Sequence, residues 1–295
     1  MKIYYSSGLF PWKQLNTILD YCRNNNIFNV ELGPSLAYSE RLIDITLSQA
    51  ESFQFILHNY FPPPEDPFVL NLASSDADIH RKSMQMCKAA IRLSSQLKAP
   101  FYSIHAGFAI DFSPSLLGNP EEQLRLGDRQ AFSIESAYER FVENVRTLSR
   151  YAKSNAVQLL VENNVISSQL VHADKSPPLL LSTPDEIIKF FSDVNDKNIG
   201  LLLDTGHAKV TAGSIGIEAE AFFNELELYI RALHLSDNNG KRDTNQPFEH
   251  DCWFAHFLKD YRHLPLIIEV YNLQPRGISR QQEILKALLL ESGTR

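Results

Sequence analysis

Cysteine is scarce in this chain of 295 residues. The three copies, Cys22, Cys87 and Cys252, lie far apart, form no CxxC motif and are odd in number. Small secreted folds that depend on disulfides carry many closely spaced cysteines in even numbers. This pattern argues against a disulfide framework, and we expect buried or free thiols in a reducing compartment.

Long apolar runs are also missing. None of the apolar segments approaches the roughly 20 residues that a membrane span requires. The first residues, MKIYYSSGLF, pass directly into a strand-like segment rather than into an apolar targeting segment. We therefore expect a cytoplasmic protein without a membrane span.

Positive charge is sparse and scattered. Lys and Arg total 28 against 35 Asp and Glu, which gives a formal net charge of −7. No basic run is longer than the pairs Arg81-Lys82 and Lys241-Arg242. Proteins that bind nucleic acid need cations to displace the counterions of the phosphates, so this balance argues against nucleic acid as the main partner.

What the sequence does contain is a regular alternation of strand-like and helix-like segments. Hydrophobic residues make up 44% of the chain and charged residues 21%, which is typical of a globular protein with an ample core. Short runs of β-branched and aliphatic residues predict strands at 2–7, 28–33, 53–58, 101–107, 157–163, 199–204, 229–237 and 264–272. Apolar residues spaced by three and four positions predict helices at 12–25, 77–98, 134–155, 183–194 and 279–292.

Strands separated by helices predict a parallel sheet, because parallel neighbours need long crossover connections. A closed (β/α)8 TIM barrel, forming a single domain over residues 1–295, fits the number of strands and the length. The alternative is a doubly wound open sheet, which would be expected to carry a glycine-rich phosphate turn after its first strand. The corresponding segment, YYSSGLFPW, is not GxGxxG, so we predict the barrel.

Chemically active residues recur where the predicted strands end. The C-terminal ends of barrel strands meet on one face, where TIM-barrel enzymes place their active sites. Consecutive strands there end at His58, His105, Glu162, Asp204 with His207 beyond it, His234 followed by Asp237, and Glu269. Each histidine or aspartate alone is compatible with a structural role or a helix cap. Glu162 and Glu269 each follow an apolar run, however, and burying an unpaired carboxylate is costly.

Such a concentration of carboxylates and imidazoles predicts a bound cation. Without one, the carboxylates would repel one another or take up protons. Mixed oxygen and nitrogen ligands without thiolate suit Mn²⁺, Zn²⁺, Co²⁺ or Fe²⁺. We expect one divalent metal ion, with Mn²⁺ or Zn²⁺ as the first choices, and leave open whether there is a second.

Four motifs resemble those of a known superfamily. They are LLVEN at 159–163, LLLDTGH at 201–207, ALHLSDNNGKRD at 232–243 and LPLIIEVYN at 264–272. They are similar to the xylose isomerase-like TIM barrels, which include ketose 3-epimerases, hydroxypyruvate isomerases and metal-dependent apurinic endonucleases. The resemblance covers nearly the whole chain and is strongest from residue 157 onward. It implies that one metal ion is held by Glu162, Asp204, His234 and Glu269.

The sugar-converting branch implies an isomerase or epimerase that acts on a small-molecule carbohydrate, a sugar phosphate or a keto-acid. There Glu162 and Glu269 would take and return a carbon-bound proton, and the metal would stabilise the enediolate. His207 would hold a substrate oxygen. The long loops at 107–132 and 163–183 would close over the site. A dehydratase of a related keto-acid is compatible with the same residues.

The endonuclease branch is an alternative, because FILHNYFPPPEDPFVLNLAS and SIHAG resemble it as well. In that branch His58 and His105 would hold a second metal ion bridged by Glu162, and otherwise both histidines are candidates for substrate binding. A third metal ion would use His207 and Asp243 together with a histidine that this chain replaces by Asn245. Asparagine is a much weaker zinc ligand than imidazole, and the loop after the fifth strand lacks a Gly-Gln-Gly stretch.

We therefore favour the sugar-converting function over an apurinic endonuclease-like zinc phosphodiesterase that acts on abasic DNA. Asp243 then counts, with His207, among the substrate-binding candidates. A non-catalytic sugar- or metal-binding barrel is the alternative outside the enzymes, since a fold does not fix a function. The presence of both Glu162 and Glu269 argues against it. The identity of the substrate and the oligomeric state, a homo-oligomer included, stay open.

Overall fold

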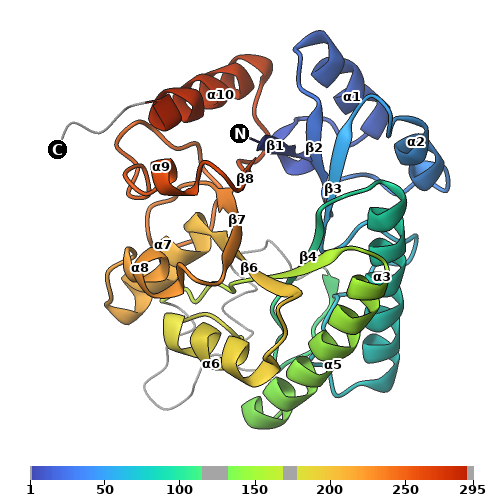
Figure 1. Ribbon diagram of the computed structural model, residues 1–295, viewed down its shortest axis with the longest axis vertical. Coiled ribbons are helices and arrows are strands. Elements are labelled where there is room, and N and C mark those ends of the chain that lie inside the picture. Colours follow the sequence, from blue (N-terminus) through green and yellow to red (C-terminus); the bar gives the residue numbers. More distant parts are fainter. Residues whose placement is uncertain (1, 115–131, 169–177, 291–295) are drawn as a thin grey trace.

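A computed structural model describes residues 2–114, 132–168 and 178–290 of the chain. Its strands are β1 (Lys2–Ser6), β2 (Asn29–Leu32), β3 (Gln54–His58), β4 (Phe101–His105), β5 (Gln158–Glu162), β6 (Ile199–Asp204), β7 (Ile230–Leu235) and β8 (Pro265–Ile268). Each strand pairs in parallel with the next along the chain, and β8 pairs with β1, which closes the barrel. The predicted (β/α)8 barrel and all of its predicted strands are thus confirmed (Figure 1).

Helices surround the ring of strands (Figure 1). They are α1 (Leu15–Asn24), α2 (Leu42–Ser48), α3 (Ala77–Gln96), α5 (Ile134–Ser154), α6 (Pro184–Val194), α7 (Thr205–Ile215), α8 (Ala221–Leu226), α9 (Leu258–Tyr261) and α10 (Pro275–Leu290), with a 3-10 turn η1 (Ser7–Leu9) after β1. The predicted helices correspond to α1, α3, α5, α6 and α10, whereas the shorter α2, α7, α8 and α9 lie outside the predicted set.

Helix α6 begins and ends where its sequence dictates. The Thr183 hydroxyl accepts a hydrogen bond from the backbone N–H of Glu186, and the Glu186 carboxylate accepts one from the backbone N–H of Thr183. This capping box satisfies N–H groups that have no partner within the first turn. Pro184 occupies that turn, where its fixed φ suits a helix. The helix ends at Asn195, whose φ of 48° is left-handed.

The inside of the barrel is filled by one layer of apolar side chains. Side chains alternate between the two faces of a strand, so every second residue points inward. The layer takes one residue from each of seven strands: Tyr4, Ile56, Phe101, Leu160, Leu202, Ala232 and Ile267. These side chains are buried and form a cluster separate from the rest of the core. At the level of this layer the barrel is therefore a packed interior rather than a channel.

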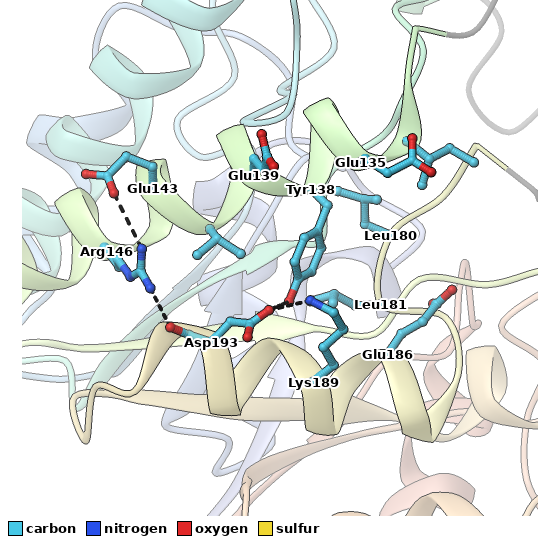
Figure 2. A pocket seen from close by; sticks show the side chains of 12 residues that line it. Glu135, Tyr138, Glu139, Glu143, Arg146, Leu180, Leu181, Glu186, Lys189 and Asp193 are labelled. Atoms are coloured by element: carbon cyan, nitrogen blue, oxygen red, sulfur yellow. Dashed lines mark hydrogen bonds and ion pairs between the residues drawn. The ribbon is translucent and has the colours of Figure 1, made fainter.

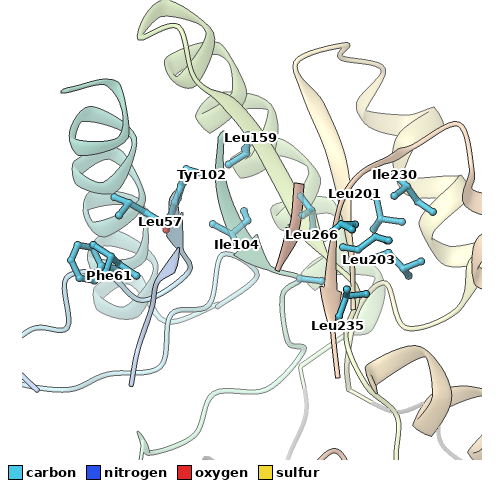
Figure 3. Close-up of a cluster of buried hydrophobic side chains, with 14 of the residues drawn as sticks. Leu57, Phe61, Tyr102, Ile104, Leu159, Leu201, Leu203, Ile230, Leu235 and Leu266 are labelled. Carbon is cyan, nitrogen blue, oxygen red and sulfur yellow. The ribbon is translucent and has the colours of Figure 1, made fainter. Parts of the chain in front are cut away.

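A second and larger core lies between the strands and the helices. The intervening residues of the strands, including Leu57, Tyr102, Leu159, Leu201 and Leu266, point outward into it (Figure 3). Helices α3, α5 and α6 supply the opposite side of this core with buried residues such as Ile91, Phe141 and Phe190. Burial of both faces of the strands explains why the strands are mainly apolar in the sequence.

The cysteines agree with the expectation from the sequence, since Cys22, Cys87 and Cys252 are all buried and free of disulfides. In the described part of the chain no helix combines the length and the apolar character that a membrane crossing would require.

Candidate metal centre at the barrel mouth

The fold brings the predicted site residues to the inner face of the barrel at the C-terminal ends of its strands. Because side chains alternate along a strand, the residue two positions beyond each member of the inner apolar layer also points inward. Five of those positions are occupied by His58 after Ile56, Glu162 after Leu160, Asp204 after Leu202, His234 after Ala232 and Glu269 after Ile267, and the other two by Ser6 and Ser103. The polar site therefore lies directly above the apolar layer.

Glu162, Asp204, His234 and Glu269 form one buried group. Each offers a ligand atom, and these atoms all lie within 4.8 Å of one another. His234 Nδ1 is at the centre of the group, 2.8 Å from Glu269 Oε2, 3.3 Å from Glu162 Oε1 and 3.8 Å from Asp204 Oδ2. Asp204 Oδ2 is buried without a hydrogen-bond partner among the described residues, and Glu162 Oε2 is buried with only imidazole nitrogens near it, in contacts that do not have hydrogen-bond geometry. Buried carboxylate oxygens without a donor fit the ligand set of a divalent cation.

His58 and His105 form an adjoining group with Glu162. The ligand atoms of these three residues also lie within 4.8 Å of one another. His58 Nε2 is 3.3 Å and His105 Nδ1 is 3.6 Å from Glu162 Oε2, while Glu162 Oε1 faces His234. Residues His105 and Glu162 are register partners on β4 and β5. The Glu162 carboxylate therefore lies between two groups of ligands, as a bridging residue would.

His207 is positioned by the beginning of helix α7. The Asp204 side chain caps this helix by accepting the backbone N–H of His207 at 2.7 Å. The His207 ring lies 2.8 Å from the Asn163 carbonyl through Nδ1 and 3.2 Å from Asp243 Oδ2 through Nε2. Asn245 does not join this contact: its side-chain amide donates to the Glu269 carbonyl. His207 thus pairs with Asp243, whereas the side chain of Asn245 holds the backbone at Glu269 by a hydrogen bond.

Burial and charge divide the histidines of the mouth into two kinds. Burial lowers the pKa of His58 to about 4 and also lowers the pKa of His105. Burial opposes protonation of His207 and His234 as well, but neighbouring carboxylates outweigh it. Asp204 and Asp243 raise the pKa of His207, and Glu269 raises that of His234, well above the usual range.

The two glutamates at the centre have pKa shifts in opposite directions. Burial raises the pKa of Glu269 well above its usual range. Burial also acts to raise the pKa of Glu162, but His105, His234 and His58 together hold it well below its usual range. Without a metal ion the site therefore favours a protonated Glu269 beside an ionised Glu162. Pairs of carboxyl groups with opposite shifts are typical of acid and base partners in active sites.

Glu31 also belongs to the site, although the sequence analysis does not single it out. It lies on β2, is fully buried, and its Oε1 atom is 2.9 Å from His234 Nε2. Its ligand atom also lies within 4.8 Å of those of His58 and His234. The signal available in the sequence is a glutamate inside the strand-like segment FNVELG, because a carboxylate in a buried strand needs a partner.

All the predicted site residues, from His58 to Glu269, are therefore brought together at one end of the barrel, with Asp243 joined to them through His207. The long loops that we expect to cover the site are described only in part, because residues 115–131 and 169–177 lie outside the described residues. The predicted closure of these loops stays a prediction.

A separate cavity of about 650 Å³ lies outside the barrel, between α5 and α6 (Figure 2). Its cationic groups are already paired, since Lys189 Nζ is 2.5 Å from Asp193 Oδ2 and Arg146 donates to the Asp193 carbonyl. The Tyr138 hydroxyl also donates to Asp193, at 2.6 Å. The cavity does not contain the groups of metal-ligating residues found at the barrel mouth, so we place the candidate site at the mouth.

Comparisons with known proteins agree with this architecture. The probable endonuclease 4 of Thermoplasma acidophilum is 26% identical over 180 residues, which cover 58% of this chain and 50% of that protein. The match therefore spans about half the length of that curated relative. A crystal structure of a D-tagatose 3-epimerase-like protein has a TM-score of 0.72 at 19% identity, covering 98% of this chain and 97% of that chain.

A Thermus thermophilus protein soaked with ZnCl2 has a TM-score of 0.66 at 19% identity over the whole of both chains. At such identities the two solved structures show a shared fold. The model of the family described as xylose isomerase-like TIM barrel matches residues 37–288, which is most of the sequence. The chain belongs to the xylose isomerase-like TIM barrel family.

Proposed function

We propose that this protein is a metal-dependent sugar isomerase or epimerase, which moves a proton on the carbon beside a carbonyl group. The observation that carries the proposal is the pair Glu162 and Glu269. Both carboxyl groups are buried, and both lie within 3.3 Å of His234 Nδ1. A base and an acid at the same substrate carbon are what proton removal and return require.

The residues at the barrel mouth fit a divalent metal ion. Three carboxylates and one imidazole converge, and two of the carboxylate oxygens are buried without a hydrogen-bond donor. Mn²⁺ or Zn²⁺ suits this donor set best, with Co²⁺ and Fe²⁺ as alternatives. When bound there, such an ion would polarise the carbonyl oxygen of a substrate and thereby acidify the neighbouring C–H group.

The remaining steps belong to side chains of this chain. One of Glu162 and Glu269 would remove the carbon-bound proton and the other would return a proton, with the roles exchanged in the reverse direction. His207 would donate a hydrogen bond to a substrate oxygen from Nε2, the nitrogen that now contacts Asp243. Proton return to the opposite face of the same carbon gives epimerisation, and return to the adjacent carbon gives isomerisation.

Exchange of substrate protons with D₂O tests this proposal. We expect the metal-loaded protein, supplied with free ketoses, to exchange the proton beside the carbonyl, as followed by ¹H NMR. Glu162→Gln and Glu269→Gln should each slow the exchange by about 100- to 10,000-fold. The control is Glu249→Gln, which alters an exposed glutamate paired with Arg280 and should leave the exchange unchanged.

Exchange in Glu269→Gln within a few fold of the wild-type rate would exclude that residue as an essential acid or base. No exchange by the metal-loaded wild type with any ketose would contradict the proposed activity itself.

An apurinic endonuclease is the second candidate, and the group formed by His58, His105 and Glu162 favours it, because it could hold a second ion. The name of the Thermoplasma acidophilum relative points the same way. Against it stand the engaged amide of Asn245, which offers no imidazole beside His207 and Asp243, and the net charge of −7. A nicking assay on duplex DNA with one abasic site separates the candidates. We expect no metal-dependent cleavage, and efficient cleavage would favour the endonuclease.

A further inference from the structure

The two ring nitrogens of His234 face different carboxylates. Nδ1 points to the predicted metal ligands and lies 2.8 Å from Glu269 Oε2 and 3.3 Å from Glu162 Oε1. Nε2 points the other way and lies 2.9 Å from Glu31 Oε1. His234 and Glu31 are both fully buried, so this contact is shielded from solvent.

An imidazole that binds a metal ion through one nitrogen has lost the proton of that nitrogen and keeps a proton only on the other. A carboxylate that accepts the N–H of one nitrogen therefore fixes which nitrogen is free, and it also makes the free nitrogen a better donor to a metal. We propose that Glu31 is a positioning residue, which holds the Nε2–H tautomer of His234 and so directs the lone pair of Nδ1 toward the metal site. This inference rests on the proposed metal-dependent function.

The position of Glu31 supports this role. In the register of the barrel Glu31 pairs with Ser6 on β1 and with Ile56 on β3, so none of the predicted site residues is its direct strand partner. Glu31 reaches the site across the barrel, through His234. Its second oxygen, Oε2, has no hydrogen-bond partner among the described residues. The contact with His234 is thus the one hydrogen bond that holds this buried carboxylate in place in the described structure.

A hydrogen bond of this kind does not require that Glu31 itself binds metal. Four residues already offer ligand atoms on the Nδ1 side of the ring: Glu162, Asp204, Glu269 and His234 itself. Glu31 approaches the opposite edge of the same ring. The geometry therefore indicates that Glu31 orients the metal ligand His234 and is not itself one of the metal ligands.

The test compares metal binding by three variants that are first shown by circular dichroism to be folded. Glu31→Leu removes the acceptor, and Glu31→Gln keeps an acceptor but removes the charge. Asn29→Ala removes a side-chain hydrogen bond to the Ile3 carbonyl at the other end of β2 and serves as the control. The probe is Co²⁺, whose affinity is measured by competition with a chelator and whose visible absorption reports the geometry of its ligands.

We expect Glu31→Leu to bind Co²⁺ about 10- to 100-fold more weakly than the wild type, with a changed absorption spectrum. Glu31→Gln should fall between Glu31→Leu and the wild type, and Asn29→Ala should match the wild type in affinity and in spectrum. A merely structural role of Glu31 would lower the stability of the protein without a change in the Co²⁺ spectrum.

Wild-type affinity and an unchanged spectrum in folded Glu31→Gln and Glu31→Leu would overturn the inference and leave the proposed function standing. Loss of one of two bound ions, with the affinity for the other unchanged, would also overturn it, because Glu31 would then be a ligand. Failure of the wild type to bind Co²⁺, Mn²⁺ or Zn²⁺ would instead contradict the proposed function, and the inference with it.

Discussion

Burial suppresses the ionisation of the three cysteine thiols. Cys22, Cys87 and Cys252 are each less than a tenth exposed, and burial raises the pKa of each thiol to about 12. The thiolate is the reactive form of cysteine, so a thiol with such a pKa is almost entirely protonated at neutral pH. We therefore expect all three thiols to be unreactive in the native protein.

We predict that an aromatic disulfide reagent such as DTNB modifies the native protein at pH 8 only slowly, at a rate limited by local opening of the fold. Three thiols should react at once after addition of guanidinium chloride. The measurement is the absorbance of the released thiolate against time. Rapid release of even one equivalent by the native protein would contradict the assigned burial.

The same thiols should make the free energy of unfolding depend on alkaline pH. Each folded pKa, about 12, lies above the value of 9.0 for an unperturbed thiol. This stabilisation is complete below pH 9 and is lost as the pH rises from 9 to 12, because the unfolded chain ionises first. The Cys22→Ala variant isolates the effect: from pH 8 to pH 10 the wild type should lose roughly 1 kcal/mol more than the variant in urea titrations. An equal loss in both proteins would contradict it.

The sequence around Glu31 does not indicate that this residue belongs to the site. Glu162 ends an apolar run and could be singled out from the sequence, whereas Glu31 lies within a strand of four residues and is followed by Leu32. Its partner His234 is 203 positions away in the sequence. The contact exists only because closure of the barrel brings β2 opposite β7, and nothing in the segment FNVELG specifies that neighbour.

At the scale of elements, the N-terminus of α6 is held by the capping box of Thr183 and Glu186. We predict that Thr183→Ala lowers the free energy of unfolding by about 1 kcal/mol, because the backbone N–H of Glu186 loses its acceptor. Urea unfolding followed by circular dichroism measures the change. Thr17→Ala, at an exposed position within α1, is the matched control and should alter stability by less than about 0.5 kcal/mol. Equal effects of the two substitutions would contradict the assigned cap.

The strands could be predicted more completely than the helices, and packing explains the difference. Most residues of the barrel strands are buried on both faces, so the strands are short and mainly apolar segments, interrupted by single polar residues such as Glu31 and Arg231. Helix α7 is buried on most of its surface, including Thr205, His207, Val210 and Thr211, and so lacks the polar face that makes a helix recognisable in a sequence. Helices α2, α8 and α9 are too short to show a periodic pattern.

At the scale of the whole molecule, the site is a consequence of closure. The inner face of the barrel is apolar in one layer and polar in the next, and residues of β2 to β8 or just beyond them supply the polar layer. Because all strands are parallel, a prediction of the fold was enough to predict that His58, His105, Glu162, Asp204, His234 and Glu269 converge. The distances between these residues, and the position of Glu162 between two groups of ligands, could not be predicted without the register of the strands.

The substrate could not be predicted in the same way. Strand ends fix the groups that carry out chemistry, but the walls of a TIM-barrel site come from the loops. Loop conformation depends on turn chemistry and long-range contacts rather than on periodic patterns. Among the loop residues of this chain, Asp243 lies beside the predicted metal ligands through its contact with His207.

Crystals soaked in MnCl2 and measured at a wavelength where manganese scatters anomalously test the central claim most directly. We predict an anomalous peak at the barrel mouth, about 2.0–2.3 Å from ligand atoms of Glu162, Asp204, Glu269 and His234 Nδ1. Glu162→Gln crystals soaked in the same way should show a weaker peak or none. A wild-type map without a peak at this site, under conditions that load other Mn²⁺ proteins fully, would contradict the assignment of the barrel mouth as a metal centre.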